Sequence, residues 1–497
     1  MKLEREAKLA VDPGFRMPDL SEPGEGMRGV AGDTDRFVST YHDTDDLRLV
    51  RWGASLRYRP TEGWTVKLPR SVDGSVMVRQ EHIFEGGPAR VPGDAVDLVR
   101  GLVRGGMLKP VARLQTVRHR TGITRVAGGQ PLADVVFDEV SVLDGHHVVE
   151  RFREVEIELA DDVEDSMMAP ILAPLVDAGA RPSEPVPKIV RALGMRAAAT
   201  PDVTVPSIGP LCTVAELVRS AVAASSERLI AHDAAVRLGD DNEGVHQARV
   251  AVRRLRSDLR SLRSMLDPDW RDELRGELGW LGGELGMVRD LDVLGERLRE
   301  HAATLLDDDD RSVSVLLDRL RVRREAARAE LLSTMREPRY VDLLDALVDS
   351  AARPRVLDDV SGVSAADVMG VVMEAPWGHL KKLCDGLGPR SADGELHEAR
   401  IRAKRVRYAA EALAPVFGRP ARRFARRAEA LQVVLGSHQD AVVAIGWLRL
   451  QGEGASPRVA FTAGVLAGVE TAARDDARRA WPEVWAELRR KRLRFWE

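Results

Sequence analysis

The stretch LEREAKLA (residues 3–10) decides how the first part of the chain is expected to fold. Successive side chains of a β-strand point to opposite faces, so Glu4, Glu6 and Lys8 would share one face of such a strand. A face of this kind is either the solvated side of an edge strand or part of a polar interior that holds metal ions. One strand does not distinguish the two interpretations, so the neighbouring strands have to be compared.

Further segments up to about residue 160 have the period-two pattern of strands. Gly, Pro and Asp separate segments that mix β-branched or aromatic residues with alternating polar ones. They are FVSTYHDT, ASLRYRP, WTVKLPR, SVMVRQEHIFE, VARLQTVRHRTGI, DVVFDEVSVLD and FREVEIELA. With the opening stretch they give about eight strands, a number that suits a closed antiparallel barrel. Helices are expected at 94–105, 163–179 and 186–194.

The pattern changes beyond residue 210. Residues 197–210 contain three prolines and few charges, and long amphipathic helices rich in Leu, Ala, Val and Arg follow them. We therefore expect a strand-rich domain over 1–200, a linker over 201–210 and a helical domain over 211–497.

The helical part contains an internal duplication. VHQARVAVRRLRSDL (245–259) matches LHEARIRAKRVRYAA (396–410), and WLGGELGMVRDLDVL matches ALQVVLGSHQDAVVA at nearly the same offset. Two repeats are expected, over about 211–350 and 365–497. The fold class is therefore expected to be α+β in two domains: an eight-stranded antiparallel β-barrel with flanking helices, then an all-α duplicated helical bundle.

Charged side chains recur on the expected inner face of most strands. Burying them without partners would oppose folding, because an unpaired buried ion is strongly unfavourable. A tunnel that holds a polyphosphate and divalent cations removes the conflict, since Arg and Lys bind phosphate oxygens and carboxylates hold hard cations. A set of solvated strand faces is the alternative. The residues concerned are Glu4, Glu6, Lys8, Arg57, Arg59, Lys67, Arg79, Glu81, Arg113, Arg118, Arg120, Asp134, Asp138, Glu154, Glu156 and Glu158.

Roughly the first 200 residues resemble the CYTH domain of the triphosphate tunnel metalloenzymes. Glu4-x-Glu6-x-Lys8 is similar to the ExExK motif of that family. The other elements follow in family order: YHDT (41–44), LRYR (56–59), TVK with Lys67, RQE (79–81), TVRHR (116–120), FDEV (137–140), EVEIE (154–158) and VPKIVRAL (186–193). One departure is Pro187 before Lys188, where the family usually has a small hydroxyl residue.

The resemblance implies a site for metal ions and a triphosphate. Mg²⁺ or Mn²⁺ would be held by Glu4, Glu6, Asp138, Glu156 and Glu158. The triphosphate would be bound by Lys8, Arg57, Arg59, Lys67, Arg118, Arg120 and Lys188. The register of TVRHR leaves open whether Arg118 or Arg120 faces the tunnel, and Arg113 is a further candidate; Glu81 would orient the basic groups. Catalysis is expected to depend on Glu4, Glu6, Lys8, Arg57 and Lys67.

The expected reaction is hydrolysis of a phosphoanhydride. One metal ion would neutralise charge on the phosphate oxygens, and a second would lower the pKa of a bound water that attacks the terminal phosphoryl group in line. Basic residues would hold the chain and stabilise the leaving phosphate. Activity should rise at alkaline pH if metal-bound hydroxide is the nucleophile.

Each helical repeat carries one basic stripe, because its histidine and basic residues follow a 3-4-3 spacing. Like charges in a stripe repel one another unless an anion compensates, and the duplication would bring two stripes together as a trough for a linear polyanion. A solvated face with structural histidines is the alternative, and Asp290 and Asp440 are expected to pair with the arginines. The stripes are His246, Arg249, Arg253 and Arg256 in the first repeat, and His397, Arg400, Lys404 and Arg407 in the second.

The segments HQARVAVRRLRS, LGMVRDLDVL, HEARIRAKRVRYAAEAL and LQVVLGSHQD resemble the CHAD domain, over about 211–497. That family is a helical duplication with characteristic histidines. The resemblance implies that the two stripes bind inorganic polyphosphate, and it implies no catalytic machinery in this half.

Composition limits the setting. The net charge of −4 gives no sign of a nucleic-acid partner. No apolar run approaches the roughly 20 residues of a membrane span, and the opening residues lack the apolar core of a signal peptide. Cys212 and Cys384 cannot form a disulfide framework, which is typical of a reducing compartment. A cytoplasmic protein is expected, with association with polyphosphate granules as a further expectation.

The two resemblances together are those of bacterial CYTH–CHAD proteins. They predict a metal-dependent inorganic triphosphatase that acts on tripolyphosphate, joined to a polyphosphate-binding helical domain. Two alternatives stay open. The same tunnel could serve an organic triphosphate, as in an adenylate cyclase or thiamine triphosphatase, or the protein could be a non-catalytic polyphosphate-binding or granule-targeting protein.

Overall fold

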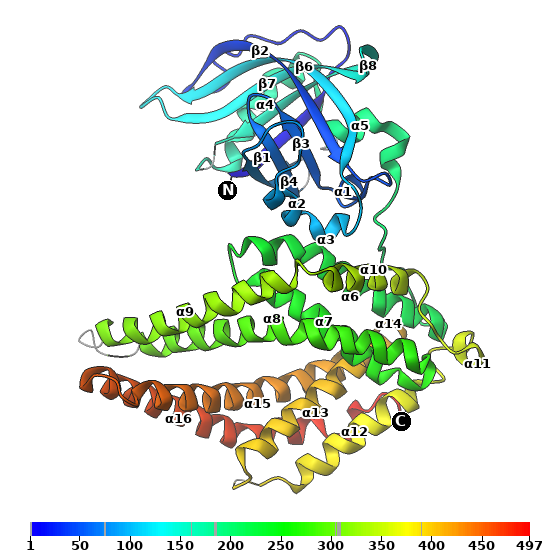
Figure 1. Cartoon of the computed structure of the whole chain (residues 1–497), viewed down its shortest axis with the longest axis vertical. Helices are drawn as coiled ribbons and strands as arrows, with labels where there is room; N and C mark the ends of the chain where they lie inside the picture. The colour runs from blue at the N-terminus through cyan, green and yellow to red at the C-terminus, as the bar shows by residue number, and fades with distance from the viewer. Residues whose placement is uncertain are drawn as a thin grey trace. The chain divides into compact units, whose positions relative to one another are not determined.

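A computed structural model describes residues 2–73, 76–160, 162–182, 186–303, 305, 310–388 and 390–497, without the side chains of residues 2–4, 70–73, 76–79 and 369. The chain forms two compact units, Met1–Asp202 and Val203–Glu497 (Figure 1). The first is built on antiparallel strands and the second on helices. Two residues expected to face inward, Glu4 and Arg79, have side chains that lie outside the described part.

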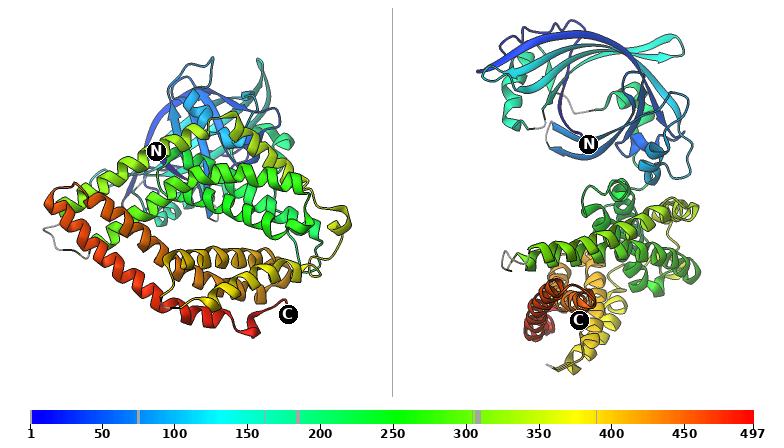
Figure 2. Two further views of the ribbon diagram at one scale, coloured as in Figure 1. Left: turned by 60° about the horizontal axis from the view of Figure 1, so that its bottom comes forward. Right: turned by 60° about the vertical axis from the view of Figure 1, so that its left-hand side comes forward.

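The strands of the first unit close into a barrel (Figure 2). Every pairing is antiparallel, the order is β5-β4-β3-β2-β6-β7-β8-β1, and pairing of β1 with β5 closes the ring; the short β9 also pairs with β1. The expected eight-stranded antiparallel barrel is thus confirmed. The strands are β1 (Lys2–Ala10), β2 (Met27–Asp43), β3 (Ser55–Arg59), β4 (Gly63–Asp73), β5 (Val76–Phe84), β6 (Lys109–Arg125), β7 (Pro131–Asp144), β8 (His147–Leu159) and β9 (Arg181–Pro182).

Strand β8 shows why the barrel has a polar interior. Glu156 faces inward, whereas Val155 and Ile157 on the opposite face are fully buried in an apolar core. Helix α4 (Met168–Asp177) contributes Ile171 to that core and so covers the outer face of the sheet. The main apolar core of this unit therefore lies outside the strands, which leaves the inner face available for charged side chains.

Short helices surround the barrel. The expected helix at 94–105 is divided into α2 (Gly93–Leu98) and α3 (Arg100–Val103), while α1 (Arg48–Arg51) was not expected. Helix α5 (Lys188–Leu193) begins directly after Pro187, whose fixed φ suits a helix start. Burial of Ile189 in an apolar cluster fixes the first turn of α5 and with it the backbone of Lys188.

The second unit repeats one order of helices. Helices α6, α7, α8 and α9 of the first repeat correspond to α12, α13, α15 and α16 of the second, and α8 lies beside α9 as α15 lies beside α16 (Figure 1). The helices are α6 (Val214–Leu238), α7 (Glu243–Ser261), α8 (Pro268–Ala302), α9 (Asp310–Thr334), α10 (Pro338–Ala352), α11 (Asp358–Ser361), α12 (Met369–Gly386), α13 (Asp393–Ala412), α14 (Ala414–Phe417), α15 (Arg419–Gly452) and α16 (Pro457–Leu488).

Apolar packing joins the two repeats. Leu298 of α8 and Leu320 of α9 share a core with Leu448 of α15 and Leu466 of α16, and all four side chains are buried. Helices α7 and α13, which carry the two basic stripes, also contact each other. Among the described helices, none combines the length and the apolar composition that crossing a bilayer requires.

Candidate functional site

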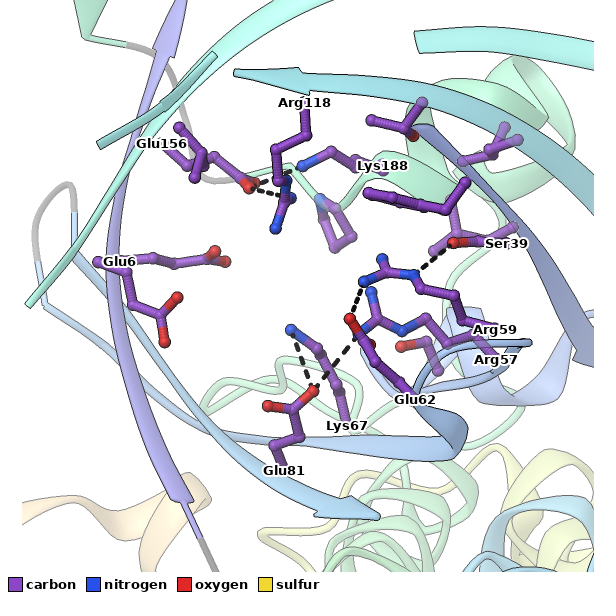
Figure 3. A pocket seen from close by; sticks show the side chains of 18 of the residues that line it. Glu6, Ser39, Arg57, Arg59, Glu62, Lys67, Glu81, Arg118, Glu156 and Lys188 are labelled. Carbon is purple, nitrogen blue, oxygen red and sulfur yellow. Dashed lines mark hydrogen bonds and ion pairs between the residues drawn. The ribbon is translucent and has the colours of Figure 1, made fainter. Parts of the chain in front are cut away.

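The barrel encloses a cavity of about 280 Å³ whose wall is mainly charged (Figure 3). We call it the tunnel cavity. Strands β1, β3, β4, β5, β6, β7 and β8 and helix α5 supply most of its basic and acidic groups, because alternate residues of each strand face inward. Its charged lining residues are Lys8, Arg57, Arg59, Lys67, Arg118, Arg120, Lys188, Glu6, Glu62, Glu81, Asp134, Glu156 and Glu158.

Three buried carboxylates at one side of the barrel form an acidic cluster, defined here as Asp138, Glu154 and Glu156. Each offers an oxygen, and these oxygens lie within 4.8 Å of one another. Asp138 of β7 stands directly opposite Glu154 of β8 in the strand register. Like charges directly opposite each other destabilise a sheet, so the cluster depends on cations that bind it.

Two lysines and one arginine supply those cations. Lys188 Nζ lies 2.6 Å from Glu154, 2.7 Å from Glu156 and 3.0 Å from Asp138. Arg118 donates two hydrogen bonds to Asp138, at 2.8 and 2.7 Å, and Lys8 forms an ion pair with Glu156. Positive charge thus reaches every carboxylate of the acidic cluster.

The charges shift the pKa values in the acidic cluster. Burial alone would raise the pKa of Glu156, but Lys188, Lys8 and Arg118 hold it well below its usual value. Burial likewise opposes the charged form of Lys188, yet the carboxylates of Glu154, Glu156 and Asp138 raise its pKa well above the usual value. Glu156 is therefore a carboxylate and Lys188 an ammonium group at neutral pH.

The other side of the tunnel cavity is basic. Figure 3 shows Arg57, Arg59 and Lys67 across the cavity from Glu156. Arg57 Nη2 lies 2.9 Å from Glu62 and 3.6 Å from Glu81, and Lys67 Nζ lies 3.8 Å from Glu81. These three cations line the cavity together with Glu62 and Glu81, and their excess of positive charge suits binding of an anion.

Arg59 is buried against an aromatic ring. Its guanidinium carbon lies 3.8 Å from the centre of the Phe37 ring, in a cation–π contact. Burial, together with the neighbouring Arg57, lowers the pKa of Arg59 to about 10. The Glu62 carboxylate pairs with both Arg57 and Arg59, and a bound phosphate would add anionic charge beside the same two arginines.

The structure resolves the question of which arginines of TVRHR face inward. Arg118 and Arg120 both line the tunnel cavity; Arg118 is mostly buried, whereas 46% of the Arg120 side chain is exposed. Arg113 lies on the opposite face of β6 and is exposed. The expectation that Arg113 faces inward is wrong, because it is an odd number of residues from Arg118 and the strand alternates.

Most of the other expected tunnel residues are brought together. Glu6, Lys8, Arg57, Arg59, Lys67, Glu156, Glu158 and Lys188 line the tunnel cavity, and Asp138 contacts two of its cations. Glu4 belongs to β1, but its side chain lies outside the described residues. The sequence reasoning omitted Glu154 from the metal ligands, although its period-two relation to Glu156 was visible. It also missed Glu62, which lies in a turn where no periodicity indicates direction.

The acidic cluster suits a hard divalent cation. Three carboxylate oxygens from two paired strands are the donors that Mg²⁺ and Mn²⁺ prefer. Their backbone positions are set by the β7–β8 pairing, and a metal ion there would compete with Lys188 for the same oxygens. The donor set therefore fits the metal that the sequence predicts.

A second concentration of charge lies where α7 and α13 meet, and we call it the trough cluster: Arg249, Arg253, Arg400 and Lys404. Arg249 Nη1 donates to Asp290, at 2.7 Å, and to the carbonyl of Gly286, at 2.9 Å. Arg253 Nε donates to the hydroxyl of Tyr408 at 2.7 Å, which joins α7 to α13. The expected pairing of Asp290 with an arginine is confirmed.

Glycine permits the same contact in both repeats. A Cβ at Gly436 would lie 3.3 Å from Arg400 Nε, and a Cβ at Gly286 would lie 3.7 Å from the Arg249 guanidinium. Each arginine therefore lies across a glycine of the long helix that follows it. The duplication is preserved at the level of individual contacts.

Lys404 has the most perturbed environment of the trough cluster. Burial, and then Arg400, Arg253 and Arg249, lowers the pKa of Lys404 to about 7, although Asp440 opposes the shift. An ammonium ion is thus destabilised there in the absence of an added anion.

The other residues that are expected to bind polyphosphate lie in different surroundings. Arg407 Nε donates to Glu411 at 2.6 Å and Arg407 Nη1 lies 3.0 Å from Glu429. Arg256 is exposed beside Gly279. His246 and His397 are half-buried, and burial together with Arg289 lowers the pKa of His246. Arg289 lies outside both stripes, so the helical spacing could not have identified it.

The comparisons with known proteins agree with the division into two units. Residues 2–169 match the CYTH domain family, and residues 220–449 match the CHAD domain family. Two Mycobacterium tuberculosis relatives, the uncharacterized protein MT2285 of strain CDC 1551 / Oshkosh and the uncharacterized protein Rv2226 of strain ATCC 25618 / H37Rv, are each 31% identical over 520 residues. These matches cover 98% of this chain and 96% of each relative.

Solved structures resemble each half separately. The CHAD domain from the plant Ricinus communis is 26% identical, with a TM-score of 0.47, and the match covers 57% of this chain and 95% of that one. HpAC1 from Hippeastrum, for which a dominant triphosphatase activity is described, is 16% identical, with a TM-score of 0.24, and the match covers 38% of this chain and 93% of that one. With a charged barrel in the region of the first family match and a duplicated helical bundle in the region of the second, this chain belongs to the CYTH–CHAD proteins.

Proposed function

We propose that the barrel hydrolyses inorganic tripolyphosphate with a divalent metal and that the helical unit binds inorganic polyphosphate. The observation that carries the proposal is the division of charge inside one cavity. Glu156 of the acidic cluster lies on one side and Arg57, Arg59 and Lys67 lie on the other. A metal–phosphate complex presents the complementary pair of charges.

The size and lining of the tunnel cavity favour a substrate made only of phosphate. Pockets for organic ligands of drug size usually have volumes of about 300–1,000 Å³ and are mainly apolar. The tunnel cavity, at about 280 Å³, is smaller and mainly charged. One face of Phe37, an aromatic ring in its wall, is covered by Arg59 and cannot stack on a base. Hydrolysis of ATP or thiamine triphosphate is therefore the weaker proposal.

Each group has a role in the proposed reaction. Glu4, Glu6, Asp138, Glu156 and Glu158, with Glu154 added, would hold Mg²⁺ or Mn²⁺, which when bound supplies charge neutralisation and an activated water. Lys8, Arg57, Arg59, Lys67, Arg118, Arg120 and Lys188 would hold the phosphate oxygens. The ordered cations would fix the terminal phosphoryl group for in-line attack and stabilise the departing phosphate.

Polyphosphate binding by the helical unit rests on the trough cluster. Burial, and then repulsion from Arg400, Arg253 and Arg249, lowers the pKa of Lys404 to about 7. A linear polyanion along α7 and α13 would remove that repulsion. His246 and His397 lie one turn before Arg249 and Arg400 and would extend the same contact.

The enzyme proposal is tested by phosphate release from tripolyphosphate, ATP and thiamine triphosphate with Mg²⁺ or Mn²⁺. Glu156→Gln should lower the rate from tripolyphosphate at least about 100-fold, because it removes a charge beside the metal and weakens the stabilisation of developing charge. Glu150→Gln is the matched control, since Glu150 is an exposed carboxylate on the same strand. No release from any of the three substrates, with polyphosphate still bound, would leave only the binding function.

A further inference from the structure

Five arginines surround a pocket of about 830 Å³ in the second half of the helical unit. We call it the arginine pocket. Arg419, Arg422, Arg423 and Arg426 come from the first two turns of α15, and Arg492 comes from the segment that follows α16. All five side chains are exposed to solvent.

Carboxylates nearby do not neutralise these arginines. Glu411 and Glu429 line the pocket, but both are ion-paired with Arg407, and Glu411 also pairs with Arg254. Within the described ranges of the chain, no ion pair joins any of the five pocket arginines to an acidic residue. The pocket therefore has a large positive charge that other parts of the protein do not compensate.

The position of four of these arginines at the start of α15 is unfavourable for the stability of that helix. A helix N-terminus carries a partial positive charge and is stabilised by acidic side chains in its first turn. The first turn of α15 has none, its N-cap is Gly418, and no side chain caps it. Four arginines in the first two turns thus oppose the helix dipole.

Helix α8, which corresponds to α15 in the first repeat, begins with acidic residues. At the start of α8, the side chain of Asp267 accepts a hydrogen bond from Trp270 N, at 2.8 Å, and Asp269 lies in the first turn. Asp272 and Glu273 follow after Trp270 and Arg271. The two helices are repeats of one unit, so the basic start is specific to α15.

We propose that the arginine pocket is a second polyphosphate-binding site, distinct from the trough cluster. Arginine binds phosphate oxygens with two parallel hydrogen bonds, and five such side chains surround this pocket. The inference rests on the proposed function, because it assigns the same ligand chemistry to another surface. A concave pocket favours a thin, flexible chain with a charge on every unit over a duplex nucleic acid, whose phosphates cannot follow the wall inward.

The two sites are arranged to act on one chain. Lys404 and Arg407 belong to one stripe of α13, and Glu411, one turn beyond Arg407, lines the arginine pocket. Lys404 and Glu411 are seven residues apart, which is about 10 Å along a helix. A long polyphosphate that occupies both sites would gain affinity by avidity, whereas tripolyphosphate would not reach both.

The first test compares two variants of the full chain in EDTA, where metal-dependent hydrolysis is stopped. Arg422→Gln with Arg423→Gln should bind long-chain polyphosphate about tenfold more weakly than the unaltered chain, because two phosphate contacts are lost. Arg323→Gln with Arg449→Gln removes the same charge from exposed positions on α9 and near the end of α15, and it should change affinity less than about twofold. Affinity is measured by isothermal titration calorimetry.

The second test locates the ligand directly. Phenylglyoxal labels accessible arginines, and peptide mass spectrometry reports each one. Polyphosphate should protect Arg422, Arg423 and Arg426 while leaving Arg323 labelled. Protection of Arg249 and Arg400 without protection of the pocket would overturn this inference and leave the proposed function standing.

Two further outcomes would also be decisive. If polyphosphate protects neither group of arginines, both the second site and the proposed binding function are overturned. If single-stranded DNA of equal charge protects the pocket as well as polyphosphate does, the assignment of this pocket to polyphosphate is overturned.

Discussion

Lys188 Nζ lies 2.6 Å from Glu154 Oε1, and the same ammonium group lies within 3.0 Å of both other carboxylates of the acidic cluster. Helix α5 thus places a cation among the three oxygens that suit a divalent metal. A metal ion and this ammonium group cannot both be stabilised fully by the same three carboxylates. A divalent metal at the acidic cluster would therefore compete with Lys188 for these carboxylates.

The first prediction concerns this competition. Lys188→Gln should bind Mn²⁺ about five- to tenfold more tightly in the absence of substrate, because the competing charge is removed. It should also hydrolyse tripolyphosphate at least about tenfold more slowly, because a phosphate contact is lost. Metal binding is measured by electron paramagnetic resonance and hydrolysis by phosphate release. Lys109→Gln, at a more exposed lysine of β6, is the control; weaker Mn²⁺ binding by Lys188→Gln would contradict the competition.

The second prediction concerns the pH dependence of polyphosphate binding. The pKa of Lys404 is lowered to about 7 in the folded protein, so the amine is largely neutral above that pH. A bound polyanion favours the ammonium form, and binding at pH 8 should therefore take up a proton. Calorimetry in HEPES and in Tris at equal pH measures that uptake, because the two buffers have different ionisation enthalpies.

Two substitutions at Lys404 distinguish the effect of its positive charge from the effect of its change of protonation. Lys404→Gln should abolish the proton uptake and weaken binding at pH 6.5. Lys404→Arg should keep the affinity up to pH 9, because arginine does not lose its proton in that range. Equal proton uptake by Lys404→Gln and the unaltered chain would assign the uptake to another group.

The third prediction concerns a buried carboxyl. Burial raises the pKa of Asp258 to about 6, although Arg254 opposes the shift. The folded state therefore binds more protons than the unfolded state between about pH 4 and 6, and this contribution to stability is lost as the pH rises through that window. The free energy of unfolding of Asp258→Asn should depend less on pH between about pH 4 and 6. The difference in free energy of unfolding between the two proteins, from urea titrations at pH 4 to 8, measures the effect, with the exposed Asp272→Asn as control.

The side chains that face the barrel interior were largely predictable, because successive side chains of a strand point to opposite faces. Once LEREAKLA is placed in a strand, Glu6 and Lys8 must share a face, and the same rule places Glu156 beside Glu158. The same rule places Arg113 on the opposite face from Arg118, because the two residues are an odd number of positions apart. Glu62 could not be placed in this way, because it lies in a turn and reaches Arg57 and Arg59 only after the strands have paired.

The helical unit was predictable in its repeats but not in its partners. Spacing along α13 identified the stripe that includes Lys404 and Arg407, but not that Arg407 pairs with Glu429 of α15. That pair depends on how two helices pack, which a single helical period does not encode. The uncompensated charge of Arg422 could not be predicted either, because it depends on Glu411 and Glu429 being paired with Arg407.

The last prediction concerns a close backbone approach that positions β2 in the barrel. A Cβ at Gly29 would lie 1.9 Å from the carbonyl oxygen of Leu20, whereas a Cβ at Gly32 of the same strand would have only ordinary contacts, the nearest at 3.5 Å. Gly29→Ala should therefore lower the stability of the barrel by about 3 kcal/mol, because the chain before β2 must move or its packing is strained. Gly32→Ala should change stability by less than about 1 kcal/mol. Hydrogen exchange of β2 and β6 peptides reports the free energy of opening for this unit alone; equal exchange rates in the two variants would mean that the segment around Leu20 does not fix the position of β2.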